Sequence, residues 1–236
     1  KSSITLLDDL VQLHTPEQPN MGGLMSNLRP YQEIGVQWLW FLYRQQLSGL
    51  LCDDMGLGKT HQAMALLASV TNLFLTYAEG SRHHFLIVCP TSVIYHWQEK
   101  LHQFLPGLKV CSFYGNKRSL ESFRQEYDVL LTSYGILRNE RDLLSKIPFE
   151  IAIFDEIQIA KNQFSRIYAA LTKIKAQMKL GLTGTPIENH LRELKSLFDI
   201  VLPSYMPGEN EYREIFIKPI EKEHDPKKKD FLNRLI

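Results

Sequence analysis

The sequence predicts an α/β fold in which a central, mostly parallel β-sheet is covered by helices on both faces. Short apolar runs alternate along the chain with segments of helical periodicity. The runs are continuously apolar, as in strands that are buried on both faces. One of them leads through a glycine-rich turn into a helix-forming segment. The expected strands are Leu47–Cys52, Phe85–Cys89, Lys109–Phe113, Val129–Thr132, Ile151–Phe154 and Lys179–Leu182.

Helices are expected between these strands. The first begins near Pro30, because proline suits the first helical position. Tyr31, Ile34, Trp38 and Phe41 have helical spacing, and Leu39, Trp40 and Tyr43 make the other side apolar, so we expect this helix to be buried over much of its surface. Three further helices present apolar faces made by Ile94, Trp97, Leu101 and Phe104, by Ile167, Leu171 and Ile174, and by Leu191, Leu194, Phe198 and Val201. We interpret Trp97 as a core residue. Right-handed crossovers bring the carboxyl ends of the strands to one edge, where a functional site is expected.

Bulk composition restricts the class of protein only loosely. The 236 residues suffice for one well-buried domain, with or without an appendage. A net charge of +1 neither supports nor excludes nucleic-acid binding. The three cysteines are interpreted as reduced core residues of an intracellular protein. No apolar run approaches the roughly 18 residues of a membrane span, so no membrane partner is expected. The ends, Lys1 and Ile236, suggest a piece of a longer protein.

The strongest local signal is the segment 53–60, which has the pattern of a phosphate-binding P-loop. Its glycines, Gly56 and Gly58, allow backbone N–H groups to surround phosphate oxygens at the start of a helix. Lys59 is expected to reach the β- and γ-phosphates, and the Thr60 hydroxyl to ligate Mg²⁺. Asp53 occupies the position of the first glycine of the general pattern. A glycine-rich turn that only joins strand to helix is the alternative, which Gly-Lys-Thr disfavours.

A second signal is the acidic pair Asp155-Glu156 at the end of an apolar strand. Two adjacent carboxylates at the tip of a core strand must be hydrated or paired. In a metal-nucleotide site, Asp155 would hold Mg²⁺ through water, and Glu156 would orient or deprotonate the attacking water. A solvated strand end is the simpler interpretation of the pair alone. The P-loop upstream favours the nucleotide site.

Several motifs follow one another in a fixed order. They are Leu28–Gln32 with Gly35 and Trp38, Asp53–Thr60, Leu86–Val93 with Trp97, Leu131–Tyr134, Asp155–Gln158 with Lys161-Asn162, and Leu182–Asn189. This series resembles the first RecA-like lobe of the Swi2/Snf2 family of helicase superfamily 2, from about residue 28 to residue 236. Thr-Gly-Thr-Pro at 183–186 distinguishes it from DEAD-box RNA helicases, and an acid at position 53 is usual in the family. Gln158 is typical of archaeal and bacterial members, so we expect a prokaryotic source.

The resemblance implies ATP and Mg²⁺ as cofactors and assigns roles to individual residues. Nucleotide binding falls to Arg29, Gln32, Asp54, Met55, Gly56, Leu57, Gly58, Lys59 and Thr60, although Met55 is expected to pack within the loop. Catalysis falls to Lys59, Asp155 and Glu156, with Mg²⁺ held by Thr60 and Asp155. Coupling of hydrolysis to movement falls to Gln158, Thr183, Gly184 and Thr185. DNA binding falls to Thr91, Ser92, Thr132, Ser133, Tyr134, Lys161 and Asn162. For Ser92, Thr132 and Ser133, helix capping or strand-end polarity is the open alternative.

The resemblance further implies an N-terminal extension and linker at 1–27, an ATP-binding lobe at 28–203, and the start of a helical protrusion at 204–236. The expected partners are double-stranded DNA, a second RecA-like lobe and a DNA-bound protein. The expected function is that of a DNA translocase, cytoplasmic and nucleoid-associated in a prokaryote or nuclear in a eukaryote. A strand-separating helicase, a P-loop ATPase that does not act on nucleic acid, and an inactive scaffold are the alternatives.

Overall fold

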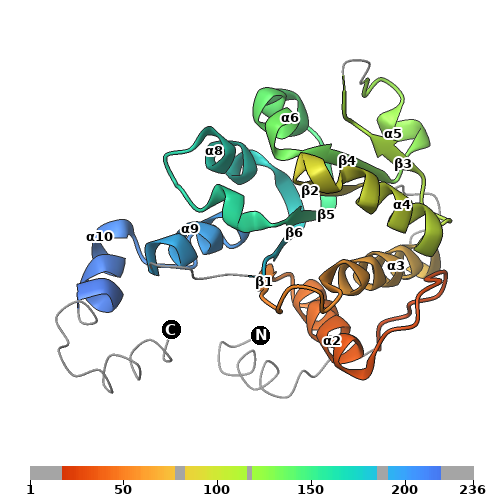
Figure 1. The fold of residues 1–236 in the computed structure, drawn as a ribbon, viewed down its shortest axis with the longest axis horizontal. Helices are drawn as coiled ribbons and strands as arrows, with labels where there is room; N and C mark the ends of the chain where they lie inside the picture. The colour runs from red at the N-terminus through yellow and green to blue at the C-terminus, as the bar shows by residue number, and fades with distance from the viewer. Residues whose placement is uncertain (1–17, 78–82, 116–118, 185–190, 219–236) are drawn as a thin grey trace.

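A single six-stranded parallel sheet forms the centre of the molecule (Figure 1). The computed structural model describes residues 18–77, 83–115, 119–184 and 191–218. The strand order is β1-β6-β5-β2-β4-β3, and every neighbouring pair is parallel. The strands are β1 (Gly49–Leu51), β2 (Phe85–Cys89), β3 (Val110–Ser112), β4 (Val129–Ser133), β5 (Pro148–Asp155) and β6 (Lys175–Leu182). The predicted fold class is therefore confirmed.

All six predicted strands exist, but the limits of three differ clearly from the apolar runs. β1 is only Gly49–Leu51, whereas β5 and β6 begin earlier than predicted, at Pro148 and Lys175. β5 and β6 pair with each other from Pro148 opposite Lys175, before either strand enters the core. Backbone pairing needs no apolar side chain, so an apolar run marks only the buried middle of a strand.

Helices cover both faces of the sheet, as the continuous apolar runs predict. One face packs against α2 (Pro30–Arg44), α3 (Lys59–Tyr77) and α4 (Ile94–Phe104). The other face packs against α5 (Phe123–Glu126), α6 (Tyr134–Asn139), α7 (Arg141–Leu144), α8 (Arg166–Lys173) and α9 (Leu191–Val201). In β2, Ile87 points to the first group and Leu86 to the second. Two short turns, η1 (Thr91–Val93) and η2 (Ile157–Ala160), follow β2 and β5.

The apolar face predicted for α2 is wrong in part. Tyr31 and Ile34 are 38% and 60% exposed, whereas Val36 and Leu39 are fully buried. α2 packs against α3, and Leu39 belongs to the same core cluster as Leu66 and Leu67 of α3. The other predicted side is confirmed, because Leu39, Trp40 and Tyr43 are buried.

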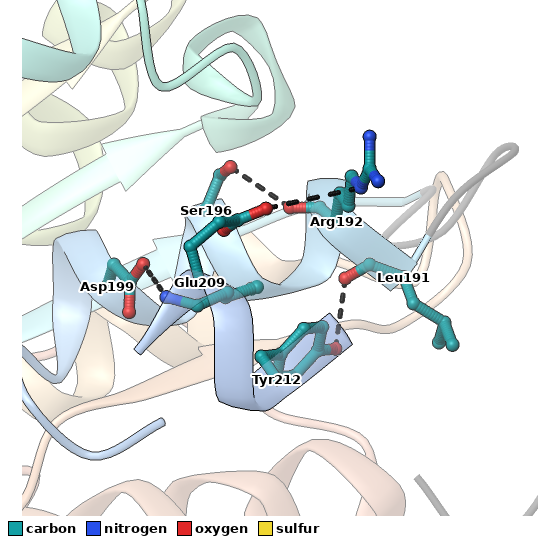
Figure 2. Close-up of polar contacts among 7 residues, drawn as sticks. Leu191, Arg192, Ser196, Asp199, Glu209 and Tyr212 are labelled. Carbon is teal, nitrogen blue, oxygen red and sulfur yellow. Dashed lines mark hydrogen bonds and ion pairs between the residues drawn. The ribbon is translucent and has the colours of Figure 1, made fainter. Parts of the chain in front are cut away.

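The described part of the C-terminal segment packs onto α9. It contains α10 (Glu209–Tyr212) and the π-helical turn η3 (Arg213–Ile217). The Tyr212 ring is fully buried, and its hydroxyl donates a hydrogen bond of 3.0 Å to the Leu191 carbonyl (Figure 2). Arg192 forms an ion pair with Glu209, with 4.0 Å between Nε of the arginine and Oε1 of the glutamate. The short helices expected here are present, while the boundary at 203/204 stays a prediction.

The expectation that every cysteine is a core residue is wrong for Cys52. Cys89 is buried in β2, whereas Cys52 lies just past the end of β1 and is exposed. Burial raises the pKa of the Cys89 thiol to about 12, which keeps it protonated near neutral pH. Within the described ranges, no helix combines the length and the hydropathy that a membrane crossing requires.

Candidate nucleotide-binding site

The P-loop, the acidic pair and the segment 183–184 meet at one edge of the sheet. They follow β1, β5 and β6, and β6 lies between the other two strands. Leu182 pairs with Leu51 on one side and with Asp155 on the other, so the three strands end at the same level. The carboxyl edge of a parallel sheet is the usual ligand site in this class of fold. The topology therefore brings together motifs separated by about a hundred residues of chain.

The P-loop has the backbone conformation that its glycines allow. Gly56 and Gly58 have φ angles of +83° and +79°, and α3 begins at the next residue, Lys59. The Lys59 ammonium donates hydrogen bonds of 2.6 and 3.0 Å to the carbonyls of Asp53 and Asp54. Lys59 is thus held over the loop from which it is expected to reach phosphate oxygens.

Gln32 links the start of α2 to the P-loop through hydrogen bonds. Its side-chain oxygen accepts a 2.8 Å hydrogen bond from the Arg29 N–H, which is one half of a capping box. Its amide nitrogen donates a 2.9 Å hydrogen bond to the Leu57 carbonyl. The Tyr31 hydroxyl donates to the same carbonyl at 3.1 Å. Tyr31 was not singled out as a site residue, and the proposed contacts of Gln32 and Arg29 with adenine stay predictions.

Gly58→Ala is expected to destabilise the chain more than Gly56→Ala. A Cβ at Gly58 would lie 2.3 Å from the Gln32 amide nitrogen, whereas a Cβ at Gly56 would meet nothing within 4 Å. Both substitutions carry the cost of a positive φ, about 1–2 kcal/mol. Only the first should also displace the Gln32 hydrogen bond, worth about 1 kcal/mol. Urea unfolding measures the loss in the free energy of unfolding for each of the two variants relative to the wild type. In a Gln32→Ala background the two substitutions should cost the same, and a persisting difference would contradict this explanation.

Asp53 has a structural partner that explains an acid at this position. Its carboxylate accepts a 3.0 Å hydrogen bond from the amide of Gln62, a fully buried residue and the fourth of α3. Gly35 of α2 leaves the space that Gln62 occupies, because a Cβ there would lie 1.8 Å from the Gln62 side-chain oxygen. The glycine and the acid are therefore linked through a glutamine that was not recognised as important.

Asp155 lies at the tip of β5, half-buried and held on both sides. One carboxylate oxygen accepts a 2.7 Å hydrogen bond from the Trp97 indole, and the other accepts a 3.1 Å bond from the Glu156 N–H. Burial raises the pKa of the Asp155 carboxyl above its ordinary value; the Trp97 hydrogen bond and the Lys59 charge oppose this rise. Trp97 is a core residue as predicted, but its contact with Asp155 was missed, since helical spacing does not show where an indole nitrogen points.

Glu156 has a strained backbone and a paired side chain. Its φ of +53° lies in the left-handed region, which is unusual for a residue other than glycine and often marks functional sites. The Gln158 amide donates a hydrogen bond to its carboxylate. The Gln158 side-chain oxygen is buried and has no hydrogen-bond partner among the described residues. Gln158, predicted to couple hydrolysis to movement, is therefore in direct contact with the expected base.

The segment after β6 touches the P-loop. Thr183 is fully buried, and its N–H donates a 3.1 Å hydrogen bond to the Leu51 carbonyl. A Cβ at Gly184 would lie 2.7 Å from Cγ of Met55. Met55 is 76% exposed, so the expectation that its side chain packs within the loop is wrong for this structure. Thr185, the third coupling residue of this segment, lies outside the described residues.

The predicted DNA-binding residues fall into two groups. Thr91 and Ser92 are exposed in η1. Thr132, Ser133 and Tyr134 are buried. Thr132 donates to the Phe113 carbonyl at 2.9 Å, the Ser133 hydroxyl accepts from the Ile136 N–H at 3.3 Å, and the Tyr134 hydroxyl donates to the Asp155 carbonyl at 2.7 Å. In this conformation these three side chains serve strand-end and capping roles, and their contact with DNA stays a prediction.

Lys161 and Asn162 follow η2 at the same edge of the sheet. The Lys161 ammonium lies 3.2 Å from the Glu193 carboxylate of α9. Asn162 is exposed, and its side chain accepts a 2.9 Å hydrogen bond from the Phe164 N–H. A role in DNA binding stays a prediction for both residues, and for Lys161 it competes with the contact to α9.

The residues present fit a magnesium nucleotide. The positive φ angles of the glycines direct loop N–H groups inward, and α3 begins at the loop. The pKa of the Asp155 carboxyl is raised, mainly by burial, and the Lys59 charge is among the groups that oppose this rise, so the P-loop and the acidic pair interact electrostatically. Hard oxygen ligands of the Thr60 and Asp155 type are those that Mg²⁺ prefers. Together with the parallel sheet, these features define a RecA-like nucleotide-binding lobe.

The particular family follows from comparison with known proteins. The family model described as the SNF2-related domain matches residues 31–236, and the chain belongs to this family. TATA-binding protein-associated factor mot1 of Schizosaccharomyces pombe is 38% identical over 213 residues, 86% of this chain and 11% of that protein. YwqA of Bacillus subtilis is 37% identical over 227 residues, 94% of this chain and 24% of that protein. The prokaryotic source stays a prediction.

A solved structure agrees with this assignment. The SWI2/SNF2 ATPase core of Sulfolobus solfataricus in complex with double-stranded DNA matches with a TM-score of 0.78 and 32% identity. The match covers 93% of this chain and 45% of that one. The chain is thus a Swi2/Snf2-type ATPase lobe of an ATP-dependent class of proteins, and it spans less than half of that core and at most about a quarter of the relatives named above.

Proposed function

We propose that this chain is the first ATP-hydrolysing lobe of a motor that translocates along double-stranded DNA and remodels protein–DNA complexes. The observation that carries the proposal is the meeting of the P-loop with Asp155 and Glu156 at the ends of β1 and β5. In this arrangement Lys59 binds the β- and γ-phosphates, and Thr60 and Asp155 hold Mg²⁺ with its water shell. Glu156 accepts the proton of the attacking water.

One contact between two motifs and one contact within a motif support coupling of hydrolysis to movement. Gly184 lies against Met55 of the P-loop, and Gln158 donates to Glu156. A change at the γ-phosphate would therefore act through direct contacts on the segments that follow β5 and β6. Movement itself requires a second RecA-like lobe, which would close the nucleotide site and supply an arginine finger.

DNA binding is proposed for the edge that carries Thr91, Ser92 and Asn162, which are exposed. Hydroxyl and amide groups suit phosphate oxygens, and phosphate contacts hold DNA without reading its sequence. The similar ATPase core of Sulfolobus solfataricus is in complex with double-stranded DNA, which supports the choice of duplex DNA as partner. The DNA-bound protein on which the motor acts is set by parts of the protein outside this lobe.

Two assays on a protein that contains this chain and a second lobe test the proposal. We expect ATP-dependent displacement of a third strand from a DNA triplex, because a motor that moves along the duplex pushes this strand off. We expect no separation of an ordinary duplex. Separation of the duplex would favour the strand-separating helicase instead.

A P-loop ATPase that does not act on nucleic acid is the second alternative. Binding to duplex DNA that weakens steeply as salt is raised would exclude it, because phosphate contacts release counterions. ATP turnover that is unaffected by duplex DNA, with no salt-sensitive DNA binding, would overturn the proposed function.

A further inference from the structure

Asp155 is held by hydrogen bonds from two segments outside its own strand. The Trp97 indole of α4 donates to one carboxylate oxygen at 2.7 Å. The Tyr134 hydroxyl, at the first residue of α6, donates to the Asp155 carbonyl at 2.7 Å. The remaining carboxylate oxygen accepts from the Glu156 N–H at 3.1 Å. Both the side chain and the backbone of Asp155 are therefore fixed before any ligand binds.

The Trp97 side chain has little freedom to leave this position. It is 1% exposed, and Ile94 and Leu101 of the same helix are buried beside it in the core. A buried indole N–H requires an acceptor, and a carboxylate is a strong one because the hydrogen bond is charge-assisted. Rotation of the indole would leave a buried donor and a partly buried carboxylate oxygen without this hydrogen bond.

Trp97 also belongs to the helix that begins at the proposed DNA edge. Ser92 is exposed in η1, and Trp97 follows it by five residues across the start of α4. At helical rise this separation is roughly 8 Å along the axis. Trp97 is therefore the side chain through which a displacement of η1 and α4 would act on the Asp155 carboxylate.

We infer that Trp97 is a positioning residue for magnesium nucleotide: its indole holds one oxygen of Asp155 and orients the other toward the metal's water shell. This inference rests on the proposed function, because it requires Asp155 to serve Mg²⁺. Residues that orient a metal-associated ligand in this way commonly influence metal affinity by about 10–100-fold. Helix α4 thereby joins the DNA edge to the metal carboxylate.

The test is the effect of Trp97→Phe on the increase in ATP affinity that Mg²⁺ produces. Phenylalanine keeps an aromatic ring in the core and removes the N–H donor. Calorimetric titration with ATP, with and without Mg²⁺, of a protein that contains this chain and the second lobe measures the increase. It should fall by about tenfold in Trp97→Phe, while the affinity measured without Mg²⁺ should change far less.

Trp40→Phe is the matched control. Trp40 lies on α2, is 2% exposed, and belongs to the same core cluster. The same loss of an indole there should leave the magnesium effect intact. In an Asp155→Asn background, Trp97→Phe should cause no further loss, because the carboxylate that it positions is absent.

Indole N–H resonances of ¹⁵N-labelled protein provide a measurement that needs no substitution at Trp97. The Trp97 resonance should move on Asp155→Asn and on addition of Mg²⁺ with ADP, and by more than the Trp40 resonance. An unchanged magnesium effect in Trp97→Phe, an equal loss in Trp40→Phe, or an unresponsive Trp97 resonance would overturn the inference and leave the proposed function intact. A wild-type protein with both lobes that binds no nucleotide would overturn both.

Discussion

Glu156→Gln, in a protein that contains this chain and the second lobe, is expected to reduce ATP turnover by about 10²–10⁴-fold, the contribution of a general base. Glutamine has the same shape but cannot take the proton of the attacking water. ATP affinity should change only a few-fold, because phosphate binding is assigned to Lys59 and the P-loop backbone. Steady-state turnover and nucleotide titration on the same protein separate the two effects.

The matched control for this prediction is Glu126→Gln, which makes the same chemical change at an exposed residue of α5. It should leave turnover unchanged. Lys59→Ala should also abolish turnover, but unlike Glu156→Gln it should abolish tight nucleotide binding as well. Normal hydrolysis by Glu156→Gln would show that Glu156 is not the base and would reassign that role at this site.

This 236-residue chain by itself is expected to bind nucleotide weakly and to show almost no DNA-stimulated ATP hydrolysis. An arginine finger from a second lobe is worth about 10³–10⁵-fold in phosphoryl transfer. Lys59 is the cation that the P-loop supplies, and in this structure its ammonium donates hydrogen bonds to the Asp53 and Asp54 carbonyls. The comparison is turnover with and without duplex DNA, for this chain and for the longer protein.

The baseline for that comparison is the residual ATP turnover of the longer protein with Lys59→Ala. Turnover of the isolated chain should be close to this background, with or without DNA. Robust DNA-dependent turnover by the isolated chain would contradict the prediction. It would mean that one lobe completes the site, and the proposed role of a second lobe in hydrolysis would then be withdrawn.

The sequence predicted the class of fold and the order of the strands along the chain, because burial on both faces of a sheet requires continuous apolar runs. It also predicted the P-loop and the acidic pair, since metal–phosphate chemistry restricts which residues can serve. It predicted less well where side chains lie. Tyr31 and Ile34 of α2 have helical spacing but are exposed. Thr132 and Ser133, assigned to DNA binding by the resemblance, are buried, in agreement with the alternative of strand-end and capping roles.

The tertiary structure decided which distant residues meet. Trp97 and Asp155 are 58 residues apart, and Gln32 contacts the P-loop 25 residues further along. No local pattern encodes such pairs, because the direction of a donor depends on how a helix is rotated against the sheet and on which strands are neighbours. The sequence by itself determined a parallel α/β lobe with nucleotide chemistry. Only the packing of α2 and α4 decided that a glutamine is tied to the P-loop and that an indole holds the acid expected to serve the metal.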